Sequence, residues 1–433
     1  MTFSIAVAVA MMVLIIVLLF REVAPPGVIF SAVPILAALL MGYGPREVNG
    51  FIGDGMKALG NTIFLMAFAI LYFGLLHDAG VFKALVQFIM RFLGNSVLGV
   101  LVITCLVGMG TQLDGSGATT ALCTIPPMKP IYERMKIRPQ ALLLMESLAS
   151  GTLCLLPWAP GLVEGSSYVG AEAFDVFRFV RPALIFMIVL MLLFCVPVAL
   201  YEKKNGAGLT REEFLKMKEE IRESVEYPFG RKIALFDGIF TLTLMVLLLA
   251  GRLPSNLAFG LGFAVLLVLN YPHIKDQREY FRKQSGTVFH MVFTLFGVAV
   301  LVGINNGTGE LGALARLIVN SAPAGAIAHI PFILCIFSLL LSITLGGAKN
   351  SVVLPAILPM VAAFGFTPQQ LFGCVFACGI VSANLSLFNA TPYLALGLAG
   401  VEMKDHLKYS LIPVQIFCWL TLLFMVVTGM MKI

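Results

Sequence analysis

Long runs of apolar residues, each about as long as a bilayer is thick, constrain the fold of this chain most. Residues 2–20 contain no charged side chain, and roughly 20 apolar residues in a helix cross a hydrocarbon core about 30 Å thick. Runs of this kind recur to the C-terminus. Because a backbone surrounded by lipid must satisfy its own hydrogen bonds, such runs form helices. The sequence therefore predicts an all-α polytopic membrane protein embedded in a lipid bilayer.

Ten of these runs are predicted to be simple crossings. They are residues 2–20, 24–43, 61–76, 138–158, 181–201, 232–250, 256–271, 288–304, 368–399 and 408–429. Three weakly amphipathic stretches, 47–60, 79–93 and 274–287, are expected to lie along the membrane interface. With 12% charged residues and a mean hydropathy of +0.96, the chain is neither a soluble enzyme nor a nucleic-acid-binding protein.

Two further apolar pairs, 97–131 and 329–363, are interrupted in the middle by glycine and polar residues. The first interruption reads Leu113-Asp-Gly-Ser-Gly-Ala-Thr-Thr120 and the second reads Leu345-Gly-Gly-Ala-Lys-Asn-Ser351. At membrane depth such a break is tolerated only where the backbone is buried in protein or lines a wet cavity. Both pairs are therefore interpreted as re-entrant hairpins.

The distribution of basic residues predicts the orientation of the chain. With ten crossings and two hairpins, 21 of the 29 Lys and Arg residues fall on one side and 7 on the other, leaving Lys349 within the membrane. Cationic loops resist translocation, so the side with 21 is cytoplasmic. This predicts a multi-pass protein of the cell inner (plasma) membrane with both termini outside.

The two halves of the chain resemble each other at an offset of 232 residues. The matched pairs are Leu113 and Leu345, Gly115 and Gly347, Leu122 and Leu354, Ile125 and Ile357, Pro127 and Pro359, and Met128 and Met360. Five crossings plus one hairpin per half is an odd number, so the second half inserts upside down, as in many secondary transporters. The expected organisation is two inverted repeats, 1–201 and 231–433, joined by a charged cytoplasmic linker, 202–230.

In each half a crossing with a proline and polar break follows the hairpin. These broken helices are 138–158 and 368–399. Freed N–H groups at a new helix start favour an anion, and freed carbonyls at the opposite end favour a cation. Substrate contacts are expected from Asp114, Gly115, Ser116, Gly117, Thr119, Thr120, Pro157, Trp158, Gly347, Lys349, Asn350, Ser351, Asn389, Thr391 and Pro392. Ion or proton coupling is expected from Asp114, Glu146, Ser150, Thr152, Ser382 and Asn384.

Three charged residues in these segments leave alternatives open. Asp114 suits a proton carrier or a cation ligand, and also a cap for the outgoing hairpin arm. Lys349 suits pairing with an anionic substrate, replacement of a coupling cation, or snorkelling to the outer interface. Glu146 suits a proton relay or a hydrogen bond between helices. No cofactor or protein-bound metal is expected, since no His lies with acids at metal spacing.

Several short motifs occur in an order that resembles a known transporter family. They are Phe68-Ala-Ile-Leu-Tyr-Phe-Gly74, Asp78-Ala-Gly80, Leu113-Asp-Gly-Ser-Gly117, Pro157-Trp158, Asn306-Gly-Thr-Gly309 and Gly397-Leu-Ala-Gly-Val-Glu402. Together they resemble the citrate–metal:proton symporter family (CitMHS) of the ion-transporter superfamily. The resemblance implies a homodimer, a scaffold domain and a mobile transport domain, and an elevator movement. It also implies that the two tips and two broken helices hold substrate and coupling ions.

The second tip departs from this family. The family carries a Ser-Asn-Asp-like run where this chain has Leu345-Gly-Gly347, with Lys349 added, and Cys154 and Leu156 are apolar where the family is polar. These departures favour a metal-free carboxylate over a substrate bound to a divalent metal.

The sequence thus predicts a secondary active transporter, not an enzyme, for a small organic anion such as citrate or another di- or tricarboxylate. Protons are the first choice of coupling ion and sodium the second. The alternative left open is an inorganic ion or oxyanion transporter or antiporter on the same fold.

Overall fold

The computed structural model of the 433-residue chain describes residues 3–21, 23–90, 92, 94–210, 212, 228–250, 252–310, 327–345, 349–386 and 390–432, and the regular structure in these residues is entirely helical. Its first half contains α1 (Phe3–Phe20), α2 (Pro26–Leu40), α3 (Pro45–Asp78), α4 (Val81–Met90), α5 (Val97–Thr111), η1 (Gln112–Asp114), α6 (Gly117–Arg134), α7 (Pro139–Leu153), α8 (Pro160–Tyr168) and α9 (Ala173–Lys204). Its second half contains α11 (Arg231–Leu249), α12 (Ser255–Asn270), α13 (Ile274–Thr308), α16 (Ile330–Ile336), α17 (Ser338–Leu345), η2 (Lys349–Val353), α18 (Leu354–Ala362), α19 (Pro368–Gly379), η3 (Val381–Leu385), α20 (Ala390–Ala399) and α21 (Met403–Val427).

Five helical segments in the described residues are long and apolar enough to cross a membrane. They are α3, Val97–Asp114, α9, α13 and α21, and α1, α2 and α12 are shorter apolar helices. Large apolar side chains such as Leu200 and Val427 remain exposed on α9 and α21, as lipid-facing positions do. The prediction of an all-α membrane protein is confirmed.

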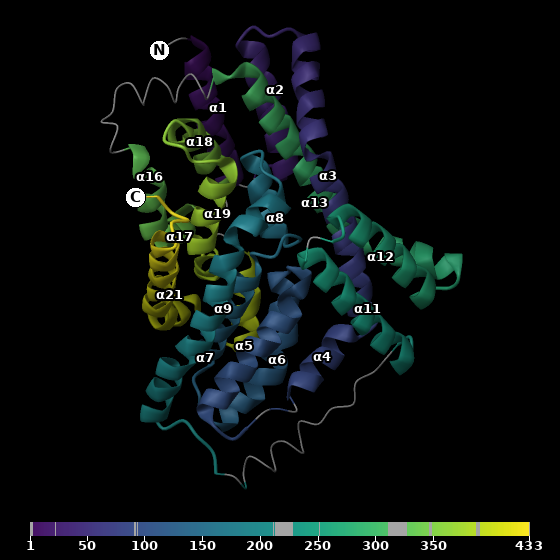
Figure 1. The fold of residues 1–433 in the computed structure, drawn as a ribbon, viewed down its shortest axis with the longest axis vertical. Coiled ribbons are helices and arrows are strands. Elements are labelled where there is room, and N and C mark those ends of the chain that lie inside the picture. The colour runs from purple at the N-terminus through teal and green to yellow at the C-terminus, as the bar shows by residue number, and fades with distance from the viewer. Residues whose placement is uncertain are drawn as a thin grey trace.

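The longest helices, α3 and α13, lie side by side through the upper part of the molecule (Figure 1). Small residues let their backbones approach closely. A Cβ atom added to Gly55 would collide with the carbonyl group of Ala299, and one added to Gly303 would collide with that of Phe51. This is the small-residue packing expected where lipid removes the usual hydrophobic drive for helix association.

These two helices also correct a prediction. Residues 47–60 and 274–287 are not separate interfacial segments, because each continues without a break into the crossing that follows it. Neither junction contains a proline, so nothing in the backbone chemistry stops the helix there. By contrast, Gly80, with φ of +77°, does separate α4 from α3.

Helix boundaries and irregular turns lie in all four regions predicted to be interrupted, although residues 346–348 and 387–389 are outside the described part of the chain. The first hairpin breaks at η1 between α5 and α6, and α7 ends at Leu153 before a new helix begins at Pro160. In the second half the chain enters a π-helical turn at η2, and η3 separates α19 from α20. The first broken helix runs further than the predicted 138–158, because α8 continues to Tyr168.

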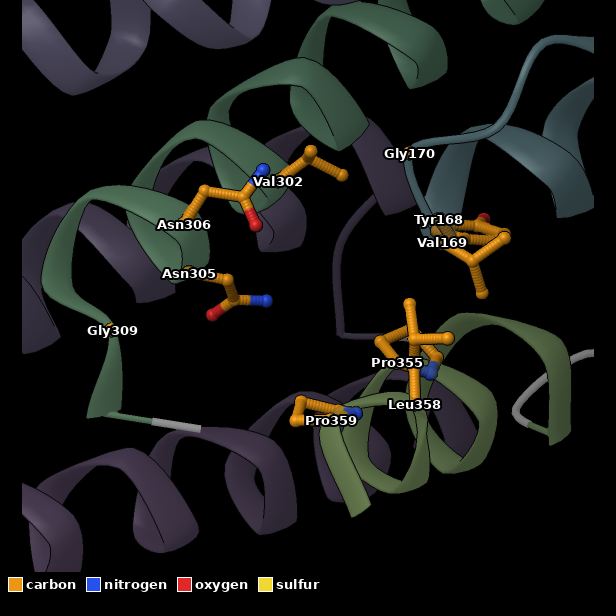
Figure 2. Close-up of a pocket in the computed structure, with 10 residues that line it drawn as sticks. All are labelled: Tyr168, Val169, Gly170, Val302, Asn305, Asn306, Gly309, Pro355, Leu358 and Pro359. Carbon is orange, nitrogen blue, oxygen red and sulfur yellow. The ribbon is translucent and has the colours of Figure 1, made fainter. Parts of the chain in front are cut away.

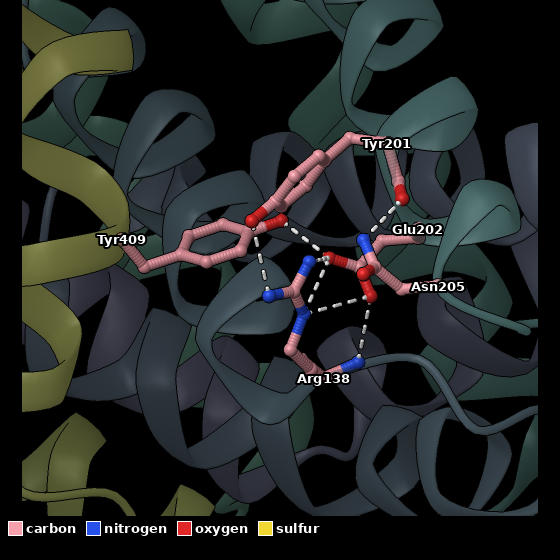
Figure 3. Close-up of polar contacts among 5 residues, drawn as sticks. All are labelled: Arg138, Tyr201, Glu202, Asn205 and Tyr409. Carbon is pink, nitrogen blue, oxygen red and sulfur yellow. Dashed lines mark hydrogen bonds and ion pairs between the residues drawn. The ribbon is translucent and has the colours of Figure 1, made fainter.

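Helix α9 continues into the segment predicted as a solvated linker. Glu202 is 1% exposed, and its carboxylate lies 2.9 Å from Nη2 of Arg138 at the start of α7 and 2.7 Å from the hydroxyl oxygen of Tyr409 in α21. Figure 3 shows the Arg138 side chain beside the neighbouring rings of Tyr201 and Tyr409. Glu202 is therefore part of the packed protein, where it joins α7, α9 and α21.

Candidate functional site

The first tip is a tight turn held together by its own side chains. Gly115 has φ of +75°, a left-handed conformation that other residues rarely adopt. The backbone N–H of Ser116 donates to Oδ1 of Asp114 at 2.8 Å, and the Ser116 hydroxyl accepts from the N–H of Thr119 at 3.3 Å. Asp114 thus closes the turn, while Ser116 caps the N-terminus of α6.

This tip packs directly against the first broken helix. The indole Nε1–H of Trp158 donates to the carbonyl oxygen of Leu113 at 2.7 Å, and Trp158 is 1% exposed. A Cβ atom on Gly115 would lie 2.7 Å from both Ala159 Cα and Pro160 Cδ. The predicted grouping of Gly115, Pro157 and Trp158 therefore exists, since the break between α7 and α8 holds the base of the tip.

The same tip also touches the second half of the chain. A Cβ atom on Gly117 would lie 2.9 Å from Cγ2 of Thr391, close to the start of α20. Pro392 is buried next to Thr391, whereas Asn389 lies outside the described residues. The start of α6 and the start of α20 thus meet, although 274 residues separate Gly117 from Thr391.

A buried polar layer next to the tip consists of Thr120, Gln112 and Cys154, of which only Thr120 was predicted as a site residue. The hydroxyl of Thr120 donates to Oε1 of Gln112, whose Nε2 donates to Sγ of Cys154 at 3.4 Å. Both Thr120 and Gln112 are fully buried. Gln112 was not predicted because it precedes the glycine-rich run, and its only signal is a lone amide at the end of an apolar stretch.

The two broken helices cross beside this layer. Nδ2 of Asn384 in η3 donates to Oγ of Ser150 in α7 at 2.8 Å, and Ser150 is also hydrogen-bonded to the buried carboxyl group of Glu146. Gly151 permits the crossing, because a Cβ atom there would lie 2.6 Å from Cα of Val381. Asn384, Ser150 and Glu146 therefore form one polar chain between the halves.

Two other residues predicted for ion coupling do not join this chain. Oγ1 of Thr152 is buried without a hydrogen-bond partner in the described part of the molecule. Ser382 lies with the second tip instead, 2.8 Å from the hydroxyl oxygen of Ser342.

At the second tip Gly347 lies outside the described residues, and Lys349, Asn350 and Ser351 begin η2. Nζ of Lys349 is 3.5 Å from Oγ of Ser342, and the side chain is 4% exposed. The Asn350 amide faces α8, since its Nδ2 lies 3.7 Å from a Cβ atom placed on Gly165, and its Oδ1 has no partner among the described residues. Ser351 is buried.

A separate cavity of about 220 Å³ lies between the C-terminal ends of α8 and α13 and the helix α18 (Figure 2). Asn305 and Asn306 border it on one side, Tyr168 on another and Pro355 on a third. None of the predicted site residues lines it. The sequence Asn306-Gly-Thr-Gly309 ends a crossing, as α13 stops at Thr308 and Gly309 has φ of +65°.

The described residues contain no group of three His, Cys, Asp or Glu side chains arranged to hold a metal ion. What they do contain is two helix starts and two helix breaks that bring polar atoms together in an otherwise apolar interior.

Comparisons with known proteins point to a family of transporters. Residues 1–342 match the model of the CitMHS family, described as citrate transporter. The citrate transporter of Bacillus subtilis (strain 168) is 28% identical over 380 residues, covering 88% of each chain, and the Mg(2+)/citrate complex secondary transporter of the same strain is 27% identical over 380 residues, covering 87% of each.

One solved structure is similar to this chain in its fold. The YdaH transporter of Alcanivorax borkumensis aligns with a TM-score of 0.55 at 16% identity, over 89% of this chain and 88% of that one. At this identity the likeness concerns the fold alone. The apolar helices and the transporter relatives make this chain an integral membrane protein, and the matched family is one of transporters rather than enzymes. The chain belongs to the CitMHS citrate transporter family.

Proposed function

We propose that this protein is a secondary active transporter that moves citrate or a related di- or tricarboxylate across the plasma membrane, driven by protons. The observation that carries the proposal is the meeting of the first tip with both broken helices, through Leu113 and Trp158 on one side and Gly117 and Thr391 on the other. Family membership and the two citrate-transporting relatives support the substrate class.

The proposed architecture is a pair of inverted repeats. In support of this, a long helix, a helix pair, a broken helix and a final long helix follow one another from α3 to α9 and, among the described residues, from α13 to α21. Five crossings and one hairpin per repeat reverse the orientation of the second, placing both termini outside. In this proposal α3 and α13 belong to a scaffold, the tips and breaks belong to a transport domain that moves as an elevator, and the protein is a homodimer.

The proposed substrate contacts are the helix starts at the tip. The first backbone N–H groups of α6 and of α20 are suited to a carboxylate, because they lack a partner within their own helix. In α6 these are the N–H groups before Thr119, whose own N–H donates to the Ser116 hydroxyl. Thr119 and Thr391 are partly exposed beside them and add hydroxyl donors. Thr120 is a supporting residue in this proposal, since its hydroxyl already bonds Gln112.

The proposed coupling groups are the carboxyls of Asp114 and Glu146. Glu146 is 3% exposed, and no basic side chain in the described structure lies within ion-pair distance of it. A buried carboxyl without a cationic partner is expensive to keep ionised at membrane depth and is suited to carrying a proton. Sodium is the second candidate for the coupling ion.

Uptake of radiolabelled citrate into proteoliposomes tests the proposal. We expect accumulation when the outside is more acidic than the lumen, loss of accumulation with a protonophore, and no requirement for sodium. Adding Mg²⁺ at saturating concentration distinguishes free citrate from the complex that one relative transports. If no di- or tricarboxylate is taken up or raises the melting temperature, while an oxyanion or an inorganic cation does, the alternative transporter function replaces this one.

A further inference from the structure

The ammonium group of Lys349 lies against α17 and the end of α19. Nζ lies 3.5 Å from Oγ of Ser342 in α17, and the side chain is 4% exposed. It also lies so close to Gly379, the last residue of α19, that a Cβ atom at that position would collide with Nζ. Lys349 therefore makes a polar contact with α17 and a close steric contact with the end of α19.

Further oxygen atoms gather around Ser342, the residue that Nζ contacts. Ser382 lies 2.8 Å from the hydroxyl oxygen of Ser342, and the hydroxyl groups of both serines lie within hydrogen-bond distance of the Gly379 carbonyl oxygen. One turn earlier in α17, the Ser338 hydroxyl donates to the carbonyl oxygen of Cys378 at 3.1 Å. Hydroxyls from α17 and η3 thus gather around the carbonyls at the C-terminal end of α19.

Nothing in this surrounding neutralises the ammonium with a full negative charge. Among the described residues no carboxylate lies within ion-pair distance of Lys349. What compensates the charge is the negative end of the α19 dipole together with hydroxyl dipoles. Freed carbonyls at the end of a half-helix are the groups with which transporters hold a coupling cation.

The first half has no equivalent charge. At the offset of 232 residues, Gly117 corresponds to Lys349 and Ser150 corresponds to Ser382. Ser150 bonds Asn384 and Glu146 rather than a lysine. The chain therefore carries a fixed cation beside one break and a carboxyl group beside the other.

We propose that the ammonium of Lys349 is a tethered cation that permanently occupies the coupling-ion position of the second half, so that only the first half takes up and releases a coupling ion. The expected effect on uptake rests on the proposed transport function, whereas the occupancy of the site by the ammonium group does not. The alternative in which Lys349 pairs with the anionic substrate requires Nζ to leave its position at α17 and α19.

Replacement of the lysine tests this without any substrate. Lys349→Ala empties the position, and a small cation is expected to enter it. In choline chloride the purified variant should melt below the wild type, and replacing choline with sodium, lithium or methylammonium at equal ionic strength should raise its melting temperature by about 5 °C. The wild type should show no such rise.

Two matched variants isolate the site. Lys349→Met keeps an unbranched chain in the position without the charge, so added cations should not restore its stability. Lys432→Ala removes a lysine that donates to a backbone carbonyl elsewhere, with Nζ 2.9 Å from the oxygen of Gly365, and should show no cation response. In proteoliposomes, uptake by Lys349→Ala should become dependent on the cation that restores its stability.

The opposite results would overturn the proposal. A Lys349→Ala variant that is as stable as the wild type in choline, insensitive to cations, yet unable to bind citrate would assign Lys349 to the substrate. If the variant cannot be purified in choline, purification in sodium or methylammonium should recover it, and failure in all three also counts against the tethered cation. Wild-type uptake is measured separately, so a wrong transport function does not obscure either outcome.

Discussion

Nδ2 of Asn384 lies 2.8 Å from Oγ of Ser150, which joins a break in the second half of the chain to a helix of the first half across 234 residues of sequence. Ser150 is bonded in turn to Glu146, one helical turn earlier. The buried carboxyl that we propose as a proton carrier is therefore connected to the opposite broken helix through a single hydroxyl group.

Asn384→Ala and Ser150→Ala should each impair uptake, and the double variant should be little worse than either single one. Both single changes break the same chain to Glu146, so their effects are not additive. Hydrogen bonds between membrane helices contribute about 0.6 kcal/mol on average, so we expect small losses of stability. A double-variant cycle in citrate uptake measures the coupling. Additive effects would show that the hydrogen bond between Asn384 and Ser150 does not couple the two halves during citrate uptake.

Asp114→Asn should uncouple citrate uptake from the pH gradient while leaving the first tip folded. The asparagine Oδ1 can still accept the Ser116 N–H, so the turn survives, but the side chain can no longer bind and release a proton. Citrate counterflow, which needs no gradient, should persist. Asp54→Asn is the control, because Asp54 is an exposed partner of Lys57 in α3. If the pH dependence of the Asp114 variant equals that of the wild type, Asp114 is only a turn residue.

Glu202→Ala should destabilise the protein by about 2 kcal/mol, since the buried carboxylate is lost while the Arg138 guanidinium beside two tyrosine rings, with its side chain 37% exposed, can still be hydrated. Arg178→Ala, which breaks the exposed pair with Asp175, should cost no more than about 1 kcal/mol. Thermal unfolding in detergent compares them. Equal effects would mean that the pair between Glu202 and Arg138 shown in Figure 3 contributes no more than an ordinary surface pair.

Gly55→Ala should lower stability although alanine is the better helix former. The added methyl group would overlap the carbonyl oxygen of Ala299, which is backbone and cannot rotate away, so α3 and α13 must separate. Gly60→Ala lies in the same helix with nothing within 4 Å of the new atom and should stabilise the protein by about 1 kcal/mol or less. Melting temperatures that rise in both variants would show that the close approach of the two helices does not hold in the membrane.

Glycine and proline positions made the breaks predictable, because turn chemistry is local. A glycine such as Gly115 can adopt a left-handed backbone at no steric cost, and a proline such as Pro160 suits the first turn of a helix, where an N–H has no partner within the helix. The prediction was wrong for residues 47–60. They were assigned to a segment separate from the crossing that follows, although α3 runs through both. Glu202 was assigned to a solvated linker because charged residues surround it in sequence, yet its partners Arg138 and Tyr409 lie far away along the chain.

The amino-acid sequence alone determined the membrane class, the positions of the tips and breaks and the resemblance to the CitMHS family. Each of these depends on apolar run length, backbone freedom or motif order, which are properties of short segments. Only the tertiary structure decided that Gly117 meets Thr391, that Asn384 bonds Ser150, and that Lys349 is directed toward Ser342 and Gly379. These pairings depend on which surfaces of distant helices pack together, and a buried polar group takes its partner from whatever that packing brings within hydrogen-bond distance.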